Sequence, residues 1–179
     1  IYGGAAAKPF ETFYNVLEEK MFLRISDELY LKRLIIGGIE KVYEIGKDFR
    51  NEGLDRFHNP EFTQLECYEA YKDYNDMMNL VEDLMRFLCT ELYQTAQIKF
   101  GERELDFSKK WQRLKFCDAL SEKTGLDILT ADPKQIEQKA IELGVLDKTA
   151  YPRPTLSKLL DKLFSQLVQK DIIEPTFVI

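Results

Sequence analysis

Hydrophobic and polar residues alternate in two stretches of the first half of the chain, Lys41–Arg50 and Phe62–Tyr71. Successive side chains of a strand point to opposite faces, so this alternation predicts two strands. The connecting stretch Asn51–Glu61 is polar and contains glycine and proline. Because no helix separates the two strands, the pattern indicates an antiparallel hairpin.

The hairpin is preceded by a predicted strand and helix. Met21–Ile25 is short and apolar, which favours a strand. Ser26 or Asp27 then caps a helix with apolar residues at helical spacing, and Gly37-Gly38 ends it.

Helical periodicity governs most of the chain after the hairpin. Asn75 or Asp76 caps a long helix with one apolar stripe, which we expect to face a core: Met77, Leu80, Val81, Leu84, Leu88 and Leu92. Ile98–Phe107 predicts a short strand pair around Gly101.

Three further helices are predicted between about residues 115 and 170. Asp132, Pro133 and Gln135 form a capping box with proline at the first helical position, and Gly144 stops that helix. Thr155 opens the last helix, whose expected core residues are Leu156, Leu159, Leu160, Leu163, Phe164 and Leu167. The final residues, Pro175–Ile179, are apolar and strand-like.

Composition places the chain among ordinary globular proteins. It has 179 residues, of which 45% are hydrophobic and 31% charged, enough for one sizeable domain. The cysteines Cys67, Cys89 and Cys117 lie far apart, which argues against a disulfide framework or zinc site and favours a reducing, cytoplasmic setting. The net charge of −6 provides no general surface for nucleic acid. We expect neither a membrane span nor a signal peptide.

Strand alternation gives the predicted hairpin two different faces. One face is polar and contains Val42, Glu44, Gly46, Asp48, Arg50, Phe62, Gln64, Glu66, Tyr68 and Ala70. The other is mainly apolar and is expected to face a core: Tyr43, Ile45, Lys47, Phe49, Thr63, Leu65 and Cys67. A polar face is often simply solvated. Acids, a guanidinium and an aromatic ring also suit a ligand that carries both a cation and a phosphate.

The exact residues around the predicted loop favour a ligand site over a solvated face. Phe49-Arg50-Asn51-Glu52, followed after a loop by His58-Asn59-Pro60-Glu61-Phe62-Thr63, resembles the second signature motif of class II aminoacyl-tRNA synthetases. This version of the motif is similar to that of the lysine-specific members. Further agreement lies in Gly3–Phe10, Leu23–Arg33 and Pro175–Phe177.

The resemblance implies an α+β fold with a mostly antiparallel sheet flanked by helices. Residues 1–179 would be part of a synthetase catalytic domain, with a small helical insertion at about residues 115–170. The implied enzyme activates lysine with ATP to lysyl-adenylate and transfers lysine to tRNA(Lys). The implied partners also include Mg²⁺, whose main ligands would lie outside this chain, and a second copy in a homodimer.

The resemblance also implies the roles of the residues around the nucleotide. Arg50 would be the catalytic clamp on the α-phosphate and the lysine carboxylate, as suits a planar bidentate cation. Glu52 would bind the adenine amino group and Phe62 would stack on the adenine ring. His58 would contact the outer phosphates together with Asn59. No residue of the chain is expected to bind a metal.

The implied lysine site combines acids, a tyrosine and glycines. Glu66 and Tyr68 would hold the lysine ammonium and side chain, and Gly3 or Gly4 would allow close approach of the backbone. Glu28 would recognise the α-amino group, although the helix macrodipole alone also favours an acid in a first helical turn.

Some features depart from the family pattern. The third class II motif, the first motif and the anticodon-binding barrel do not occur in this sequence, so we expect that residues 1–179 alone do not aminoacylate. Arg56 is offset from the basic residue that many relatives carry beside the histidine. Three alternatives stay open: a paralogue that lysylates elongation factor P, aspartyl or asparaginyl specificity, and a non-catalytic synthetase-like binding module.

Overall fold

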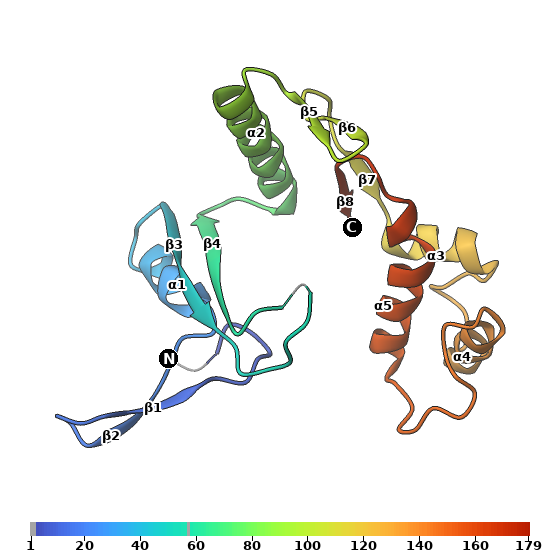
Figure 1. Cartoon of the computed structure of the whole chain (residues 1–179), viewed down its shortest axis with the longest axis horizontal. Helices are drawn as coiled ribbons and strands as arrows, with labels where there is room; N and C mark the ends of the chain where they lie inside the picture. The colour runs from blue at the N-terminus through green and yellow to red at the C-terminus, as the bar shows by residue number, and fades with distance from the viewer. Residues whose placement is uncertain (1–2, 57) are drawn as a thin grey trace. The chain divides into compact units, whose positions relative to one another are not determined.

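The computed structural model describes residues 3–56 and 58–179, and the chain forms two compact units, Ile1–Asp73 and Tyr74–Ile179. The first unit contains β1 (Glu11–Tyr14), β2 (Glu19–Phe22), α1 (Glu28–Ile36), β3 (Lys41–Phe49) and β4 (Glu61–Glu69) (Figure 1). Its strands pair as two antiparallel hairpins, β1 with β2 and β3 with β4.

The first hairpin differs from the sequence-based expectation. β2 ends at Phe22, so the predicted strand at Met21–Ile25 is displaced toward the N-terminus, and β1 was not predicted. Every residue of both strands is exposed. Strands are predicted from the alternation of apolar and polar residues along the sequence, and a strand without a buried face does not require that alternation.

Helix α1 begins and ends where the sequence indicates. The hydroxyl of Ser26 accepts a hydrogen bond from the backbone N–H of Glu28 at 3.1 Å, which satisfies one of the free donors at the helix start. At the other end, Gly38 has a φ of 97°, a conformation that L-residues with a side chain rarely adopt. Of the two predicted caps, Asp27 occupies the N-cap position without a side-chain cap hydrogen bond, and Ser26 supplies the acceptor; the stop at Gly37-Gly38 is confirmed.

The β3–β4 hairpin has the predicted antiparallel pairing. Glu44 lies opposite Glu66, Gly46 opposite Gln64, and Asp48 opposite Phe62. This register places the polar residues of both strands on one face, as strand alternation required.

The burial of the two hairpin faces is the reverse of our expectation. The apolar face is exposed, with Tyr43 72% and Ile45 64% accessible, whereas Asp48 on the polar face is fully buried. The reason lies in what packs where within this unit. α1 and the segment before it contact the polar face, as in the hydrogen bond from the Ser26 hydroxyl to the Glu66 carboxylate. The prediction that the apolar face lies in a core is wrong for the described residues.

The second unit contains strands and helices in succession. These are α2 (Tyr74–Tyr93), β5 (Gln97–Phe100), β6 (Arg103–Asp106), β7 (Gln112–Leu114), α3 (Phe116–Thr124), α4 (Pro133–Glu142), α5 (Leu156–Leu167), a 3-10 helix at Gln169–Asp171, and β8 (Thr176–Val178). With the first unit they make the chain α+β, as predicted. β5 and β6 confirm the predicted strand pair, and Gly101 in their turn has a φ of 60°.

The core of the second unit lies among α3, α4 and α5. Leu120, Ile136, Ala140 and Leu163 are almost completely inaccessible there. The three helices predicted between residues 115 and 170 are confirmed. Leu156 is an exception to the expected core set, since it is exposed at the first position of α5.

The capping box of α4 is formed as predicted. The Asp132 carboxylate accepts from the backbone N–H of Lys134 at 2.8 Å, and the Gln135 side chain accepts from the Asp132 N–H at 3.1 Å. The helix ends before Gly144, which has a φ of 70°. Local sequence signals were sufficient here because every partner lies within one helical turn.

Helix α2 buries a different face from the one expected. Met78, Glu82 and Cys89 are buried, whereas most of the expected apolar stripe is exposed, with Leu92 70% accessible. Glu82 accepts hydrogen bonds from the side chain of Arg113 and, at 3.0 Å, from the backbone N–H of Trp111. These long-range partners orient the helix, and its apolar stripe alone does not reveal them.

The strand pairing of the described residues is more fragmented than predicted. They form four two-stranded sheets, three antiparallel and one parallel, the last joining β7 to β8. The larger mixed sheet that we expected is not formed within them. None of the described helices is long and apolar enough to cross a membrane.

Candidate functional site

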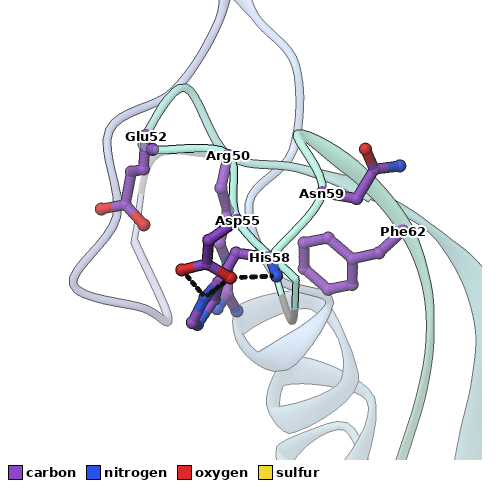
Figure 2. Close-up of a pocket in the computed structure, with 7 residues that line it drawn as sticks. Arg50, Glu52, Asp55, His58, Asn59 and Phe62 are labelled. Carbon is purple, nitrogen blue, oxygen red and sulfur yellow. Dashed lines mark hydrogen bonds and ion pairs between the residues drawn. The ribbon is translucent and has the colours of Figure 1, made fainter.

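The loop between β3 and β4 forms a pocket of about 500 Å³ at one end of the hairpin (Figure 2). It is lined by Arg50, Glu52, Gly53, Asp55, His58, Asn59 and Phe62. The structure therefore brings together all five residues for which the sequence implied nucleotide contacts.

Arg50 is held at the mouth of this loop by contacts on both sides. Its backbone N–H donates to the carbonyl of Pro60 at 2.9 Å, and its Nε donates to the carbonyl of Ile25 at 3.3 Å. Its guanidinium carbon lies 5.0 Å from the centroid of the Phe62 ring, within the range of a cation–π contact. An arginine tethered through Nε still has its two terminal nitrogens for an anion.

His58 is oriented by an acid that the sequence reasoning did not single out. Both carboxylate oxygens of Asp55 lie within 2.9 Å of the His58 Nδ1, and Asp55 also accepts from the His58 backbone N–H at 2.9 Å (Figure 2). With Nδ1 donating to Asp55, Nε2 is the nitrogen left for a ligand. The sequence signal that could have indicated this pair is the spacing of three residues between Asp55 and His58.

Asn59 and Glu52 line the pocket at different places. The Asn59 side-chain amide donates to the backbone carbonyl of Glu61 at 2.6 Å and points away from His58 in Figure 2. The Glu52 carboxylate lies at the other side of the pocket in the same view. The joint contact of His58 and Asn59 with phosphate stays a prediction.

The glycines near the N-terminus pack against the start of α1. Gly4 has a φ of 88°, and a Cβ there would lie 3.0 Å from both Glu28 Cβ and Ser26 Oγ. Gly3 has a φ of 139°, and its Cβ would lie 2.9 Å from a methyl group of Leu29. Both positions need glycine for conformation and for space, and they bring this backbone beside Glu28.

Glu66 lies on the polar face among neutral hydrogen-bond donors. Its carboxylate accepts from Ser26 Oγ at 3.0 Å, from Gln64 Nε2 at 2.7 Å and from the Tyr68 hydroxyl at 3.4 Å. Burial, followed by the charges of Glu66 and Glu28, raises the pKa of Tyr68 to about 12. Tyr68 is therefore a neutral donor at physiological pH.

One corner of this face already accommodates an ammonium group of the chain itself. Lys32 Nζ lies 2.6 Å from the Glu28 carboxylate and 5.7 Å from the centroid of the Tyr68 ring. An acid and an aromatic face together form the environment that an ammonium prefers. Glu28, Glu66 and Tyr68 thus surround a region suited to a primary amine.

Beneath the polar face lies a buried group of acids around Arg24. Asp27 and Asp48 are 1% and 0% accessible, and burial is the main cause that raises the pKa of each. Arg24 Nη1 lies 2.8 Å from Asp27 Oδ1 and also pairs with Glu44. The sequence placed Glu44 and Asp48 on this face but gave no reason to place Arg24 and Asp27 beside them.

The comparisons with known proteins show the family of the chain. A family model described as tRNA synthetases class II (D, K and N) matches residues 1–179. The chain belongs to this family. It is 51% identical over 179 residues to a lysine–tRNA ligase of Roseiflexus sp. (strain RS-1), covering 100% of this chain and 36% of the relative.

Other class II relatives give the same result. A lysine–tRNA ligase of Aquifex aeolicus (strain VF5) is 48% identical over 181 residues, covering 100% of this chain and 30% of the relative. One of Clostridium botulinum (strain Loch Maree / Type A3) is 46% identical, covering 99% of this chain and 36% of the relative. The chain thus spans about a third of the length of the curated relatives that it matches. The resemblance to class II synthetases is confirmed.

Proposed function

We propose that the whole protein that carries this chain is a lysyl-tRNA synthetase, which activates lysine with ATP to lysyl-adenylate and then transfers lysine to tRNA(Lys). The observation that carries the proposal is the position of Arg50. Arg50 lines the pocket of the β3–β4 loop, and its Nε donates to the carbonyl of Ile25, whose chain neighbour Ser26 contacts Glu66 on the polar face. A substrate with a phosphate at one end and an ammonium at the other suits this arrangement.

The loop pocket is the proposed ATP site. Phe62, whose ring lines this pocket, stacks on the adenine ring. Glu52 accepts from the adenine amino group. His58, oriented by Asp55, and Asn59 bind the outer phosphates. Arg50 holds the α-phosphate with its free terminal nitrogens, for which a guanidinium is suited.

The acidic face is the proposed lysine site. Glu28 pairs with the α-ammonium next to the backbone of Gly3 and Gly4, while Glu66 and Tyr68 hold the ammonium-bearing part of the substrate. A cation leaving water needs a charged partner, and two carboxylates with neutral supporting donors meet that requirement. The ammonium of Lys32 between Glu28 and Tyr68 supports the proposed chemistry of this corner.

The first chemical step requires no general base. The lysine carboxylate is ionised at neutral pH and attacks the α-phosphorus, and pyrophosphate leaves with the electrons of the broken P–O bond. The residues therefore act by positioning and by stabilising negative charge. Arg50 contacts both the attacking carboxylate and the α-phosphate, so it is the proposed catalytic residue.

Further features of the whole protein follow from this proposal. It acts as a homodimer in the cytoplasm, and this chain forms part of its catalytic sheet, with α3, α4 and α5 as a helical insertion. Mg²⁺ would accompany ATP. Within residues 3–56 and 58–179 there is no group of three or more His, Cys, Asp or Glu side chains that could hold a metal ion.

Amino-acid-dependent ATP–pyrophosphate exchange by the whole protein tests the proposal. Lysine, aspartate and asparagine are compared in parallel, and exchange with lysine alone is expected. Transfer of labelled lysine to tRNA(Lys) is then compared with transfer to elongation factor P, and only tRNA should accept it. Exchange with aspartate or asparagine, or with none of the three, would refute the proposed function.

A further inference from the structure

The side chain of Arg24 lies across strand β3 on the polar face of the hairpin. Its Nε donates to the carbonyl of Lys47 at 2.8 Å. Its Nη1 pairs with Glu44 and with Asp27, the latter at 2.8 Å. Only 33% of the Arg24 side chain is accessible to solvent. This one guanidinium therefore compensates acids from both β3 and the segment before α1.

Gly46 makes this position of Arg24 possible. A Cβ atom on Gly46 would lie far inside van der Waals contact with Nη2 of Arg24, and its next neighbours would be Arg24 Cζ and Glu44 Oε1. The φ of Gly46 is not in the left-handed region, so its backbone does not require glycine. The lack of a side chain at Gly46 leaves room for the Arg24 guanidinium.

The two glutamates of the face lie directly opposite each other. Glu44 on β3 pairs in register with Glu66 on β4, and like charges at such positions destabilise a sheet. Their partners differ. Glu44 is paired with the Arg24 cation, whereas the contacts of Glu66 given above are with the neutral groups of Ser26, Gln64 and Tyr68.

We propose that Arg24 is a positioning residue for amino acid recognition. Arg24 neutralises Glu44, so that of the two opposed glutamates only Glu66 binds the substrate ammonium. Gly46 contributes to the same pairing, since it provides the space for the Arg24 guanidinium. This inference rests on the proposed lysine site. It adds two residues, Arg24 and Gly46, that do not touch the substrate.

Displacing the Arg24 side chain should impair lysine binding in a specific way. Glu44 would then face Glu66 without its cation, and two adjacent carboxylates share a proton or compete for one ammonium. The Arg24 backbone is held separately, since its carbonyl accepts from the Phe49 N–H at 2.8 Å. The effect should therefore be confined to the lysine side, with little change at the ATP pocket.

Gly46→Ala and Arg24→Met test this in the whole protein by lysine-dependent ATP–pyrophosphate exchange. Gly46→Ala moves only the flexible end of the arginine, and Arg24→Met removes its charge. We expect each to raise the KM for lysine by roughly tenfold, the scale of a coupling of about 1.4 kcal/mol between contacting groups. The KM for ATP should stay within about twofold. Arg33→Met, on the exposed side of α1, is the matched control and should leave both KM values unchanged.

A second substitution separates charge from structure. Glu44→Gln alone should leave the KM for lysine nearly unchanged, because Glu44 is not the ligand. Added to Gly46→Ala or to Arg24→Met, it should restore the KM for lysine to within about threefold of the wild type, since it removes the competing carboxylate.

Each of the following results would overturn the inference. These are an unchanged KM for lysine in Gly46→Ala and Arg24→Met, an equal rise in the KM values for lysine and ATP, or no rescue by Glu44→Gln. A large rise in the KM for lysine in Glu44→Gln alone would also overturn it, and this variant leaves Arg24 and Gly46 in place. The wild-type reaction provides the reference for the proposed function itself. Lysine-dependent exchange there, without the expected changes in the variants, would refute this inference alone.

Discussion

Individual residues of this site are constrained by partners that lie far away in the sequence. Arg50 contacts the carbonyl of Ile25, and Glu66 accepts from Ser26. The three residues before α1 therefore support both the loop pocket, through Arg50, and the polar face, through Glu66. Asp27 and Asp48 are buried beneath it with raised pKa values.

Arg50→Lys should abolish most of the exchange activity. Lysine keeps the positive charge but cannot hold phosphate and carboxylate with two parallel donors. We expect kcat for lysine-dependent exchange to fall by at least ~100-fold, as when a single transition-state donor is lost. Arg33→Lys on the exposed side of α1 is the matched control. A decrease of less than about threefold in Arg50→Lys would contradict the catalytic role.

Asp48→Asn should stabilise the protein at neutral pH. Burial raises the pKa of Asp48, so its ionisation costs folding free energy as the pH rises through the folded-state pKa. Asparagine has no such cost, and we expect a gain on the order of 1 kcal/mol at pH 7. The gain should disappear at a pH below the pKa of an unfolded aspartate, at about 3.9. Urea unfolding at both pH values measures this gain. Arg24 Nε lies 3.6 Å from Asp48 Oδ1, and destabilisation at pH 7 would show that this contact outweighs burial.

Gly4→Ala and Gly38→Ala form a matched pair for the close approach at α1. Both glycines have a positive φ, 88° and 97°, but only Gly4 has atoms of Glu28 and Ser26 within 3.0 Å of a new Cβ. Both variants should lose about 1 kcal/mol of stability from backbone strain. Only Gly4→Ala should raise the KM for lysine, by roughly tenfold if the crowding costs about 1.4 kcal/mol. Equal KM values in the two variants would remove Gly4 from the lysine site.

At the scale of helices and strands, local signals and tertiary contacts contribute unequally. α4 has its cap within four residues, whereas α2 is oriented by Glu82 and its partners Trp111 and Arg113. Burial alone would raise the pKa of the Glu82 carboxyl, but the hydrogen bonds from Arg113 and Trp111 outweigh it, so its pKa lies below the ordinary value. The start of α4 therefore depends on neighbouring residues, whereas the orientation of α2 depends on residues that are distant in the sequence.

Asp132→Ala should destabilise α4 without affecting the proposed site. It removes the acceptor for the Lys134 N–H and leaves that donor unpaired at the start of the helix. The expected loss is about 1 kcal/mol, measured by thermal unfolding of the whole protein. Lys134→Ala keeps the backbone N–H and provides the control. Asp132→Asn should recover most of the loss because asparagine also caps helices.

At the scale of the whole molecule, the two units are built on different kinds of contact. α3, α4 and α5 enclose a continuous apolar core. Among the described residues 3–56 and 58–73, the buried apolar side chains are only Ala7, Ile25 and Leu31. Buried apolar area is the main source of folding stability. The first unit therefore depends more on hydrogen bonds, ion pairs and whatever binds to its polar face.

Ligands should accordingly stabilise the whole protein against heat. A ligand present at 100 times its Kd adds about 2.7 kcal/mol to the stability of the state that binds it. We expect ATP with lysine to raise the Tm by several degrees, and ATP with aspartate to give no more than ATP alone. Differential scanning fluorimetry measures this. An equal shift with aspartate would contradict the proposed amino acid specificity.

The sequence by itself determined the features that depend on neighbours in the chain. The capping box at Asp132, the helix stop at Gly37-Gly38, the pairing of β3 with β4 and the two faces of that hairpin all follow from spacing and local chemistry. The motif in the β3–β4 loop likewise indicated which residues line one pocket. Strand alternation and helix caps act over a few residues, so a linear pattern contains them.

Only the tertiary structure decided which surfaces are covered and which charges are paired. Alternation separated the faces of the hairpin, but the packing of α1 and Arg24–Ser26 partly buried the polar face and left Tyr43 and Ile45 on the other face exposed. The pairing of Arg24 with Glu44, 20 residues away, depends on where the backbone turns. Burial and charge compensation are set by atoms brought together from distant positions, and no local pattern records that distance.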